Sequence, residues 1–224
     1  METFRGYPVL MRTIRIGRRD YEIIGPANYD QLIDTAAVAE RFARDEYLPY
    51  WAEFWPAARV MAERLLEWGP AGSAPRPTVL ELGCGLGLVG LIAADLGYPT
   101  TMTDYDDDSV AFAEENIRRN RISNATARTL DWTTFDPTME FDRIIACEVL
   151  YEDRHIAPIA RFIQNHLRPG GFALVCDTGR RPADAFSEAV GACGLAVRIE
   201  RDSVPRPGEN PLPIRLFHVT CFAT

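Results

Sequence analysis

Glycines and a carboxylate gather in one short stretch of the chain, residues 78–97. Glu81 lies near the end of a short apolar run, and Gly83, Gly85 and Gly87 follow it at alternate positions. Glycines at this spacing permit positive φ and let the backbone approach a ligand closely. The apolar residues that follow have helical spacing, and the free N–H groups at a helix start attract electronegative ligand atoms. The stretch therefore predicts a strand, a glycine loop and a helix start that together bind a nucleotide-like cofactor.

The same glycines also fit the dinucleotide pattern G-x-G-x-x-G, from Gly85 to Gly90. Two features favour S-adenosyl-L-methionine (SAM) over a dinucleotide. The charge of Glu81 suits a sulfonium cofactor that carries an ammonium group, whereas it would repel a pyrophosphate. The glycine loop also lies far from the N-terminus, although dinucleotide folds often begin near theirs. We therefore expect SAM as cofactor and S-adenosyl-L-homocysteine as product, with Cys84 in the loop that binds them.

Acidic and aromatic residues also lie at the ends of the second and third predicted strands. Asp104 precedes Tyr105, and Asp131 precedes Trp132. In open α/β sheets, ligands bind beyond the carboxyl ends of the strands. We expect the Asp104 carboxylate to accept both ribose hydroxyls and Tyr105 to lie against the adenine. Asp131 and Trp132 are expected to meet the adenine amino group and to stack on its ring.

Glu148 and Tyr151 lie at the end of the fourth predicted strand, and a polar residue after a buried apolar run needs a partner or a task. A lysine amine has a pKa of about 10.4 in water and must lose its proton before it can attack a methyl group. Glu148 could orient such an amine or accept its proton, directly or through water, and Tyr151 could present its ring to the ammonium. We therefore predict both as catalytic residues, with the Cys147 backbone beside the adenine or methionine part of the cofactor.

Alternating strand and helix patterns run from residue 78 to the end of the chain. Strands are predicted over 78–83, 100–104, 125–130, 141–149, 171–177, 195–201 and 214–222, and helices near 87–97, 107–121, 155–167 and 182–193. This alternation is typical of a doubly wound α/β fold. The last two strands are joined by a proline-rich link without a helix pattern, which predicts an antiparallel hairpin. The expected core is a Rossmann-like, seven-stranded, mostly parallel sheet with an antiparallel edge hairpin at its C-terminal end.

Residues 1–77 are predicted to form an N-terminal extension packed on the SAM-binding core, residues 78–224, within one structural domain. The extension should contain a β-hairpin (12–16 with 21–24), a helix (30–44), an aromatic segment (47–55), a second helix that begins at Pro56 (56–68) and a connector (69–77).

The chain of 224 residues has a net charge of −8, with 47% hydrophobic and 25% charged residues. These proportions are ordinary for a soluble globular protein. The acidic balance disfavours a nucleic-acid partner and suits a basic protein or a small molecule better.

Five widely spaced cysteines without C-x-x-C indicate a reducing compartment, without disulfides or a zinc site. No secretory signal or membrane span is visible. We expect a cytoplasmic protein, a monomer or weak dimer, without a metal site.

Four motifs together resemble the seven-β-strand protein lysine methyltransferases grouped as methyltransferase family 16. They are the Trp-Pro segment at 50–58, the loop at 81–87, the acid Asp104, and Glu148-x-x-Tyr151. The aromatic segment looks closest to the branch that acts on the electron transfer flavoprotein β-subunit, and to its bacterial relatives. The resemblance covers roughly 50–178. It implies a class I methyltransferase fold, SAM contact by Trp55, and a lysine on a protein as the acceptor.

One departure and two rival functions accompany this resemblance. Many relatives carry Asp where this chain has Glu148, so the charge is kept and shifted by one methylene. The Asn/Asp-Pro-Pro-Tyr run of nucleobase-directed members is absent at 148–151. Nicotinamide-like N-methylation of a small molecule, under a lid of Trp51 and Phe54, is one rival. A non-catalytic SAM-binding module is the other. We expect the Arg180–Arg181 pair to be solvated, and the three histidines to have surface or capping roles.

Overall fold

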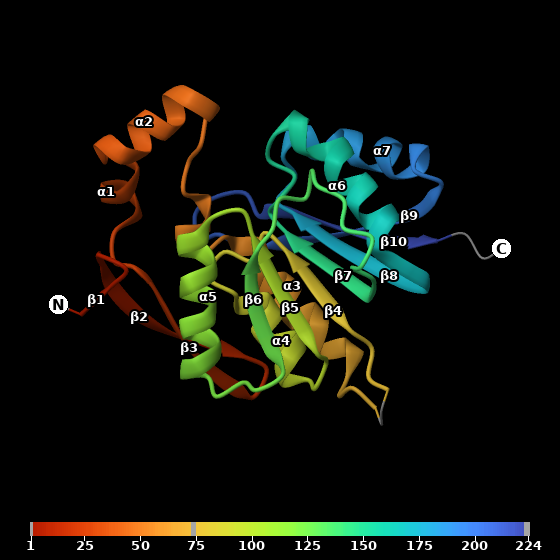
Figure 1. The fold of residues 1–224 in the computed structure, drawn as a ribbon, viewed down its shortest axis with the longest axis horizontal. Helices are drawn as coiled ribbons and strands as arrows, with labels where there is room; N and C mark the ends of the chain where they lie inside the picture. The colour runs from red at the N-terminus through yellow and green to blue at the C-terminus, as the bar shows by residue number, and fades with distance from the viewer. Residues whose placement is uncertain (1, 73–74, 222–224) are drawn as a thin grey trace.

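The computed structural model describes residues 2–72 and 75–221. Residues 73–74 of the predicted connector and Phe222 of the last predicted strand lie outside this range. Figure 1 shows a small antiparallel sheet near the N-terminus beside a larger sheet that carries helices on both faces. Within the described part of the chain, no helix is long and apolar enough to cross a membrane.

The larger sheet has seven strands in the order β6-β5-β4-β7-β8-β10-β9. They are β4 (Val79–Leu82), β5 (Thr100–Asp104), β6 (Ala125–Thr129), β7 (Phe141–Cys147), β8 (Leu167–Asp177), β9 (Leu195–Val204) and β10 (Leu212–Cys221). All neighbours from β6 to β8 pair in parallel, while β10 runs antiparallel to both β8 and β9. The predicted Rossmann-like sheet with an antiparallel C-terminal hairpin is therefore confirmed. The strand order reverses beside β4, which is where this class of fold binds its ligands.

Two layers of helices cover the sheet. One face carries α3 (Pro56–Leu65), α4 (Leu88–Asp95) and α5 (Asp107–Arg119), and the other carries α6 (Asp153–His166) and α7 (Phe186–Ala192). Side chains alternate between these layers along each strand. On β4, Val79 packs in the α4 layer, whereas Leu80 and Leu82 pack in the α6 layer. Glu81 therefore shares the α4 side with Val79.

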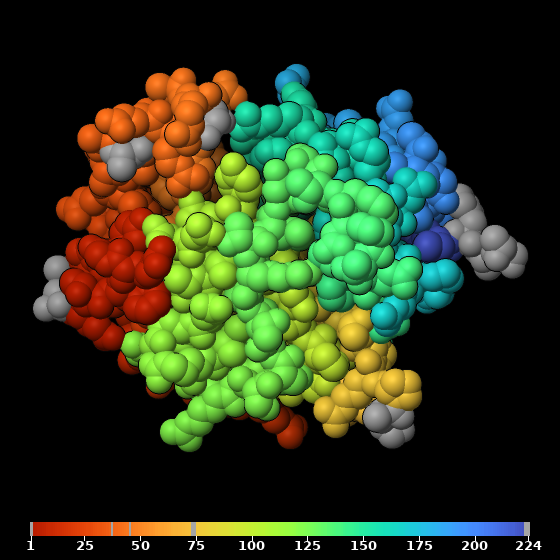
Figure 2. All heavy atoms as spheres, viewed as in Figure 1, coloured from red at the N-terminus to blue at the C-terminus, as the bar shows by residue number. Residues whose placement is uncertain are grey.

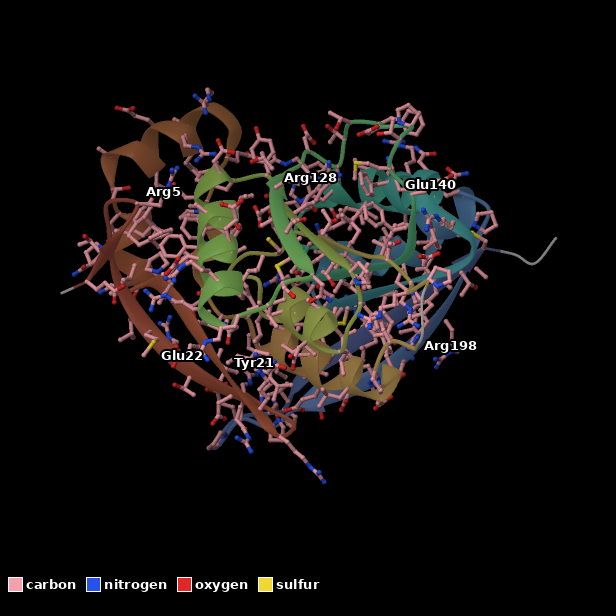
Figure 3. The ribbon with its side chains drawn as sticks, turned by 60° about the horizontal axis from the view of Figure 1, so that its bottom comes forward. Arg5, Tyr21, Glu22, Arg128, Glu140 and Arg198 are labelled. Atoms are coloured by element: carbon pink, nitrogen blue, oxygen red, sulfur yellow. The ribbon has the colours of Figure 1, made fainter. Side chains whose placement is uncertain are left out.

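The N-terminal extension forms a three-stranded sheet of β1 (Thr3–Phe4), β2 (Tyr7–Ile16) and β3 (Arg19–Pro26). The predicted hairpin is present and its strands are longer than expected. In Figure 2 this segment, in red, lies against the green part of the core, where α5 is drawn. The contact is polar as well as apolar. The side chain of Asn116 on α5 bonds both the N–H and the C=O of Ile24 on β3, and that of Asn120, which follows α5, bonds both groups of Glu22. The hydroxyl of Tyr21, a β3 residue labelled in Figure 3, donates to Asp95 of α4 at 2.8 Å.

Short helices connect the extension to the core. The single predicted helix at 30–44 is two helices, α1 (Tyr29–Ile33) and α2 (Ala36–Asp45), because the Thr35 side chain caps a new helix by accepting from the Val38 N–H. The aromatic segment contains the turn η1 (Tyr50–Ala52) and leads into α3, with Pro56 in its first turn as predicted. A further turn, η2 (Leu66–Trp68), ends α3, and η3 (Arg181–Ala185) precedes α7.

Candidate active site

A cavity of about 500 Å³ lies at the carboxyl ends of β4, β5, β6 and β7. The glycine loop after β4 and the aromatic segment before α3 form part of its wall. The predicted site residues all line this cavity; they are Trp55, Glu81, Gly83, Cys84, Gly85, Gly87, Asp104, Tyr105, Asp131, Trp132, Cys147, Glu148 and Tyr151. Residues that lie far apart in the sequence thus meet in one space, large enough for a small-molecule cofactor.

The glycine loop forms a backbone floor for this cavity. Gly83, Gly85 and Gly87 have φ values of 65°, 52° and 83°, in the left-handed region that favours glycine. A Cβ on Gly85 would lie 3.2 Å from the Trp51 carbonyl oxygen, and one on Gly83 would lie 2.6 Å from the Val149 side chain. The loop is therefore packed from outside by the aromatic segment and by the residues after β7, and a side chain at either position would displace them.

Glu81 is a buried carboxyl group with an incomplete set of partners. Its side chain is 2% exposed, and its Oε2 atom has no hydrogen-bond partner among the described residues. Burial raises the pKa of Glu81 to about 8; the Gly90 N–H opposes that shift and the charge of Asp104 adds to it. A buried carboxyl group that lines a cavity and has an incomplete set of partners is suited to a cationic or hydrogen-bond-donating ligand group. The ammonium of SAM fits this requirement and a pyrophosphate does not.

Asp104 ties the end of β5 to the glycine loop. Its Oδ2 accepts from the Gly85 N–H at 2.9 Å, and its Oδ1 accepts from the Asp106 N–H at 3.1 Å. Burial raises the pKa of Asp104. Asp106 in turn caps α5 by accepting from the Asp108 N–H at 2.8 Å. Tyr105 is 57% exposed and lies at the edge of the cavity.

Five aromatic rings form a continuous wall across the cavity. Ring-centroid distances along the series Trp55, Tyr50, Tyr151, His155 and Trp132 are 5.9, 5.0, 5.0 and 5.3 Å. His155 is thus a wall residue whose pKa is lowered by burial, and the expected surface or capping role is wrong for it. Its spacing of four residues from Tyr151, at the start of a helix, is the signal that could have identified it.

Glu148 lies between two neighbours from the end of β8. Its φ is +59° and its side chain is 4% exposed. The Oε2 atom accepts from the Thr178 hydroxyl at 3.1 Å and pairs with the Arg180 guanidinium at 3.1 Å, while Oε1 is without a hydrogen-bond partner in the described structure. Burial raises the pKa of Glu148, Arg180 lowers it, and Asp177 raises it.

Arg180 and Arg181, which we expected to be a solvated pair, lie in two different environments. The Arg180 guanidinium also lies 5.0 Å from the Trp55 ring centroid and 6.0 Å from that of Tyr151. The Arg181 side chain is 88% exposed and lies 3.8 Å from the Asp153 carboxylate. The expectation of a solvated side chain is therefore wrong for Arg180 and holds for Arg181. The sequence contains no local signal for this difference, because Glu148 and Trp55 are distant in the chain.

Trp51 is a fixed part of the wall. It is 7% exposed, its Nε1 donates to the Tyr47 hydroxyl at 3.1 Å, and its ring lies 5.3 Å from that of Phe112. This packing is that of a core residue and not that of a movable lid. Across residues 2–72 and 75–221, no three His, Cys, Asp or Glu side chains are grouped as a metal site would need.

Comparison with known proteins identifies relatives of the segment that forms this cavity. The sequence model of a family described as lysine methyltransferase matches residues 50–188. A ribosomal protein L11 methyltransferase of Methylococcus capsulatus is 28% identical over 133 residues, 58% of this chain and 43% of that protein. A protein N-lysine methyltransferase of Xenopus tropicalis is 32% identical over 105 residues, 45% of this chain and 47% of that protein. The chain thus spans less than half the length of these curated relatives.

Solved structures share the fold at low sequence identity. The glycopeptide N-methyltransferase MtfA in complex with sinefungin has a TM-score of 0.60 at 13% identity, covering 75% of this chain and 95% of that one. A TehB-like SAM-dependent methyltransferase from Corynebacterium glutamicum has a TM-score of 0.56 at 17% identity, covering 87% and 100%. With the family match over residues 50–188, these likenesses show that the chain belongs to the lysine methyltransferase family and has the fold of the class I SAM-dependent methyltransferases.

Proposed function

We propose that the chain is a SAM-dependent N-methyltransferase whose acceptor is a lysine side chain of a protein. One observation carries this proposal: a single cavity holds two buried carboxyl groups, each with one oxygen that has no partner among the described residues. Glu81 lies at the glycine loop, and Glu148 lies among aromatic rings. One cation at each end would satisfy them, the ammonium of the cofactor at Glu81 and the acceptor amine at Glu148.

The residues around the glycine loop suit the cofactor. SAM, when bound, supplies a methyl group on a sulfonium, which makes the methyl carbon electrophilic. Gly83, Cys84, Gly85 and Gly87 offer a backbone surface close to the amino-acid part, and the Asp104 carboxylate retains lone pairs for the ribose hydroxyls. The remaining members of the proposed cofactor set are Trp55, Tyr105, Asp131, Trp132 and the Cys147 backbone, all of which line the cavity.

The residues around Glu148 suit an amine. Tyr50, Trp55 and Tyr151 present aromatic rings that attract a cation and exclude water from it. The free Oε1 of Glu148 can accept a hydrogen bond from the amine and can take its proton, directly or through water. Holding the amine in line with the methyl carbon would provide most of the rate enhancement, through proximity and orientation. Glu148 and Tyr151 are therefore the proposed catalytic residues.

The charge of the cavity wall favours a basic acceptor segment over a neutral small molecule. The carboxylates Glu46, Glu53, Asp106 and Glu152 line the cavity in addition to the four in the proposed site, whereas its basic lining residue is Arg154. A lysine within a basic peptide would be attracted to such a surface. The chain itself contains no lysine, since all 24 of its Lys and Arg residues are arginine. An acceptor lysine must therefore come from another molecule.

The experiment that tests the proposal uses purified protein, tritiated SAM and a lysate of the source organism. We expect label in one or a few protein bands, released as methyl-lysine after acid hydrolysis, and absent with Glu148→Ala. Label in the band of the enzyme itself cannot be a methylated lysine side chain, because the chain has none. Glu140→Ala is the matched control, because Glu140 lies on the loop before β7, outside the cavity lining (Figure 3).

Two other outcomes would replace the proposal. Label confined to a small soluble product would indicate small-molecule N-methylation of the nicotinamide type. The absence of any label, together with tight SAM binding in a parallel titration, would favour a non-catalytic SAM-binding module. Loss of SAM binding in Glu148→Ala would contradict the assignment of Glu148 to the acceptor end of the cavity.

A further inference from the structure

The loop after β8 supplies two contacts to Glu148, and both reach the same atom. The Thr178 hydroxyl and the Arg180 guanidinium each lie 3.1 Å from Oε2. Oε1 receives no hydrogen bond from the described residues. The carboxyl group is thus divided into one anchored oxygen and one available oxygen, although a freely rotating carboxylate would offer its two oxygens equally.

Arg180 is itself held at both ends. Its backbone N–H donates to Asp177 Oδ1 at 3.0 Å, and its carbonyl oxygen accepts from the Arg215 guanidinium at 2.7 Å. Arg215 also pairs with Asp177, which is fully buried, at 2.9 Å. At its other end, the Arg180 guanidinium lies over the rings of Trp55 and Tyr151. Because these contacts fix Arg180 relative to the end of β8, its guanidinium can hold the Glu148 carboxyl group in a defined position.

Arg180 contacts three lining residues without lining the cavity itself. It therefore stands behind the wall that Glu148, Trp55 and Tyr151 present to the acceptor. From this geometry we propose that Arg180 is a positioning residue for methyl transfer, which anchors one oxygen of Glu148 and leaves the other for the acceptor amine. The inference deepens the proposed function and depends on its assignment of Glu148.

The positive charge of Arg180 has a second consequence for the amine. A lysine ammonium beside an isolated carboxylate would be stabilised in its protonated form, which cannot attack a methyl group. Because the guanidinium already balances Glu148, the ammonium gains less from staying charged. Arg180 thus favours the neutral amine that the reaction requires. Without it, the acceptor would bind at least as tightly and react more slowly.

The positive φ of Glu148 agrees with a position that is imposed by its surroundings. Residues other than glycine adopt this region at a cost and keep it only where neighbouring contacts fix them. The Glu148 N–H donates to the Cys176 carbonyl at 2.8 Å, so the backbone stays joined to β8 while the side chain turns toward Thr178 and Arg180. The ionisable and charged groups around Glu148 are Cys147 on β7, Tyr151 on the following loop, Asp177 at the end of β8 and Arg180 on the loop after it.

The kinetic test compares Arg180→Gln with Arg180→Lys and with Arg181→Gln, measuring kcat and KM for the protein acceptor across a pH series. We expect Arg180→Gln to lower kcat roughly tenfold, the scale of one hydrogen bond to a charged group, with KM unchanged or lower. The acidic limb of the kcat profile should move to higher pH, because Arg180 lowers the pKa of Glu148. Arg180→Lys should restore the position of that limb. Arg181→Gln should match the wild type, since its side chain is exposed.

A second measurement does not depend on turnover. The side-chain carboxyl carbons of glutamate are labelled with ¹³C and titrated by NMR, with Glu148 assigned by the signal missing from Glu148→Gln. We expect the Glu148 midpoint to be higher in Arg180→Gln than in the wild type. An unchanged midpoint together with an unchanged kcat would overturn the proposal. A shifted midpoint in a protein that transfers no methyl group would retain the anchor and reject the proposed function.

A third variant covers the case in which Arg180→Gln does not fold. Thr178→Val removes the other bond to Oε2 and keeps the shape of the side chain. We expect it to lower kcat severalfold and to leave the charge on Arg180 in place, so the acidic limb should move less than in Arg180→Gln. Wild-type kcat in this variant would contradict anchoring through Oε2.

Discussion

The carboxylate of Glu81 on β4 lies where a side chain of residue 90 in α4 would otherwise be. A Cβ built on Gly90 would overlap Glu81 Oε2 and would also press on the Met102 side chain. Glu81 and Met102 are both buried and occupy neighbouring strands, in register with one another. The third glycine of the G-x-G-x-x-G pattern therefore makes room for a carboxyl group between the sheet and its first helix.

Substituting Gly90→Ala should destabilise the protein, although Gly→Ala in a helix interior normally stabilises it by up to about 1 kcal/mol. We expect a loss of about 1–3 kcal/mol in the free energy of unfolding, because overpacking a closed site displaces its neighbours. Gly191→Ala in α7 is the matched control, since nothing lies within 4 Å of its Cβ position. Chemical denaturation of both variants measures the difference. A stabilised Gly90→Ala protein would show that Glu81 is not confined as described.

The ligand-free protein should lose stability as pH rises across the range in which Glu81 titrates. Burial raises the pKa of Glu81 from its ordinary 4.5 to about 8, so the folded state binds this proton more tightly than the unfolded state does. The stabilisation is fully present below pH 4.5 and is lost as pH approaches 8. Glu81→Gln stays neutral and should be more stable than the wild type at pH 8, by up to a few kcal/mol. Denaturation curves at pH 5 and pH 8 test this, and parallel pH dependences for the two proteins would contradict it.

Binding of SAM should release a proton if its cation meets Glu81. The cation favours the ionised carboxylate, so affinity should rise with pH between about 5 and 7, where the α-amino group of the ligand is still charged. Calorimetry in two buffers with different ionisation enthalpies measures the proton count directly. Glu81→Gln should lower both the affinity and the number of protons released. Equal proton release in the variant and the wild type would assign the effect to another group.

Much of this site could be predicted from the sequence because its parts are local or share one edge of the sheet. The strand, glycine loop and helix around Glu81 are contiguous in the chain. Asp104 and Glu148 follow parallel strands, whose carboxyl ends must meet. By contrast, the pairing of Arg180 with Glu148 depends on how two loops pack against Trp55, and no residue pattern encodes that contact.

The boundaries that differ from expectation have local causes. β8 begins at Leu167, before the predicted start at residue 171, because the Pro-Gly-Gly run at 169–171 looks like a turn and is in fact part of the strand. The pairing of β7 with β8 shifts register between Phe141 and Arg143, and this irregularity accommodates the run. A glycine-rich segment inside a strand is often the mark of such a shift.

Replacing Asp104 with asparagine separates its structural contact from its proposed ligand contact. Asn keeps one carbonyl oxygen that can accept from the Gly85 N–H, so the glycine loop should retain its conformation, while the bond from the Asp106 N–H is lost. The variant loses the negative charge and one acceptor for a ribose hydroxyl, and a hydrogen bond to a charged group is worth about 1.5–3 kcal/mol. We therefore expect SAM affinity to fall at least tenfold while the melting temperature changes little. Calorimetry and thermal unfolding of the same sample measure both quantities. Unchanged affinity would reject the ribose assignment, whereas equal losses of affinity and stability would show that Asp104 acts on the ligand only through the loop.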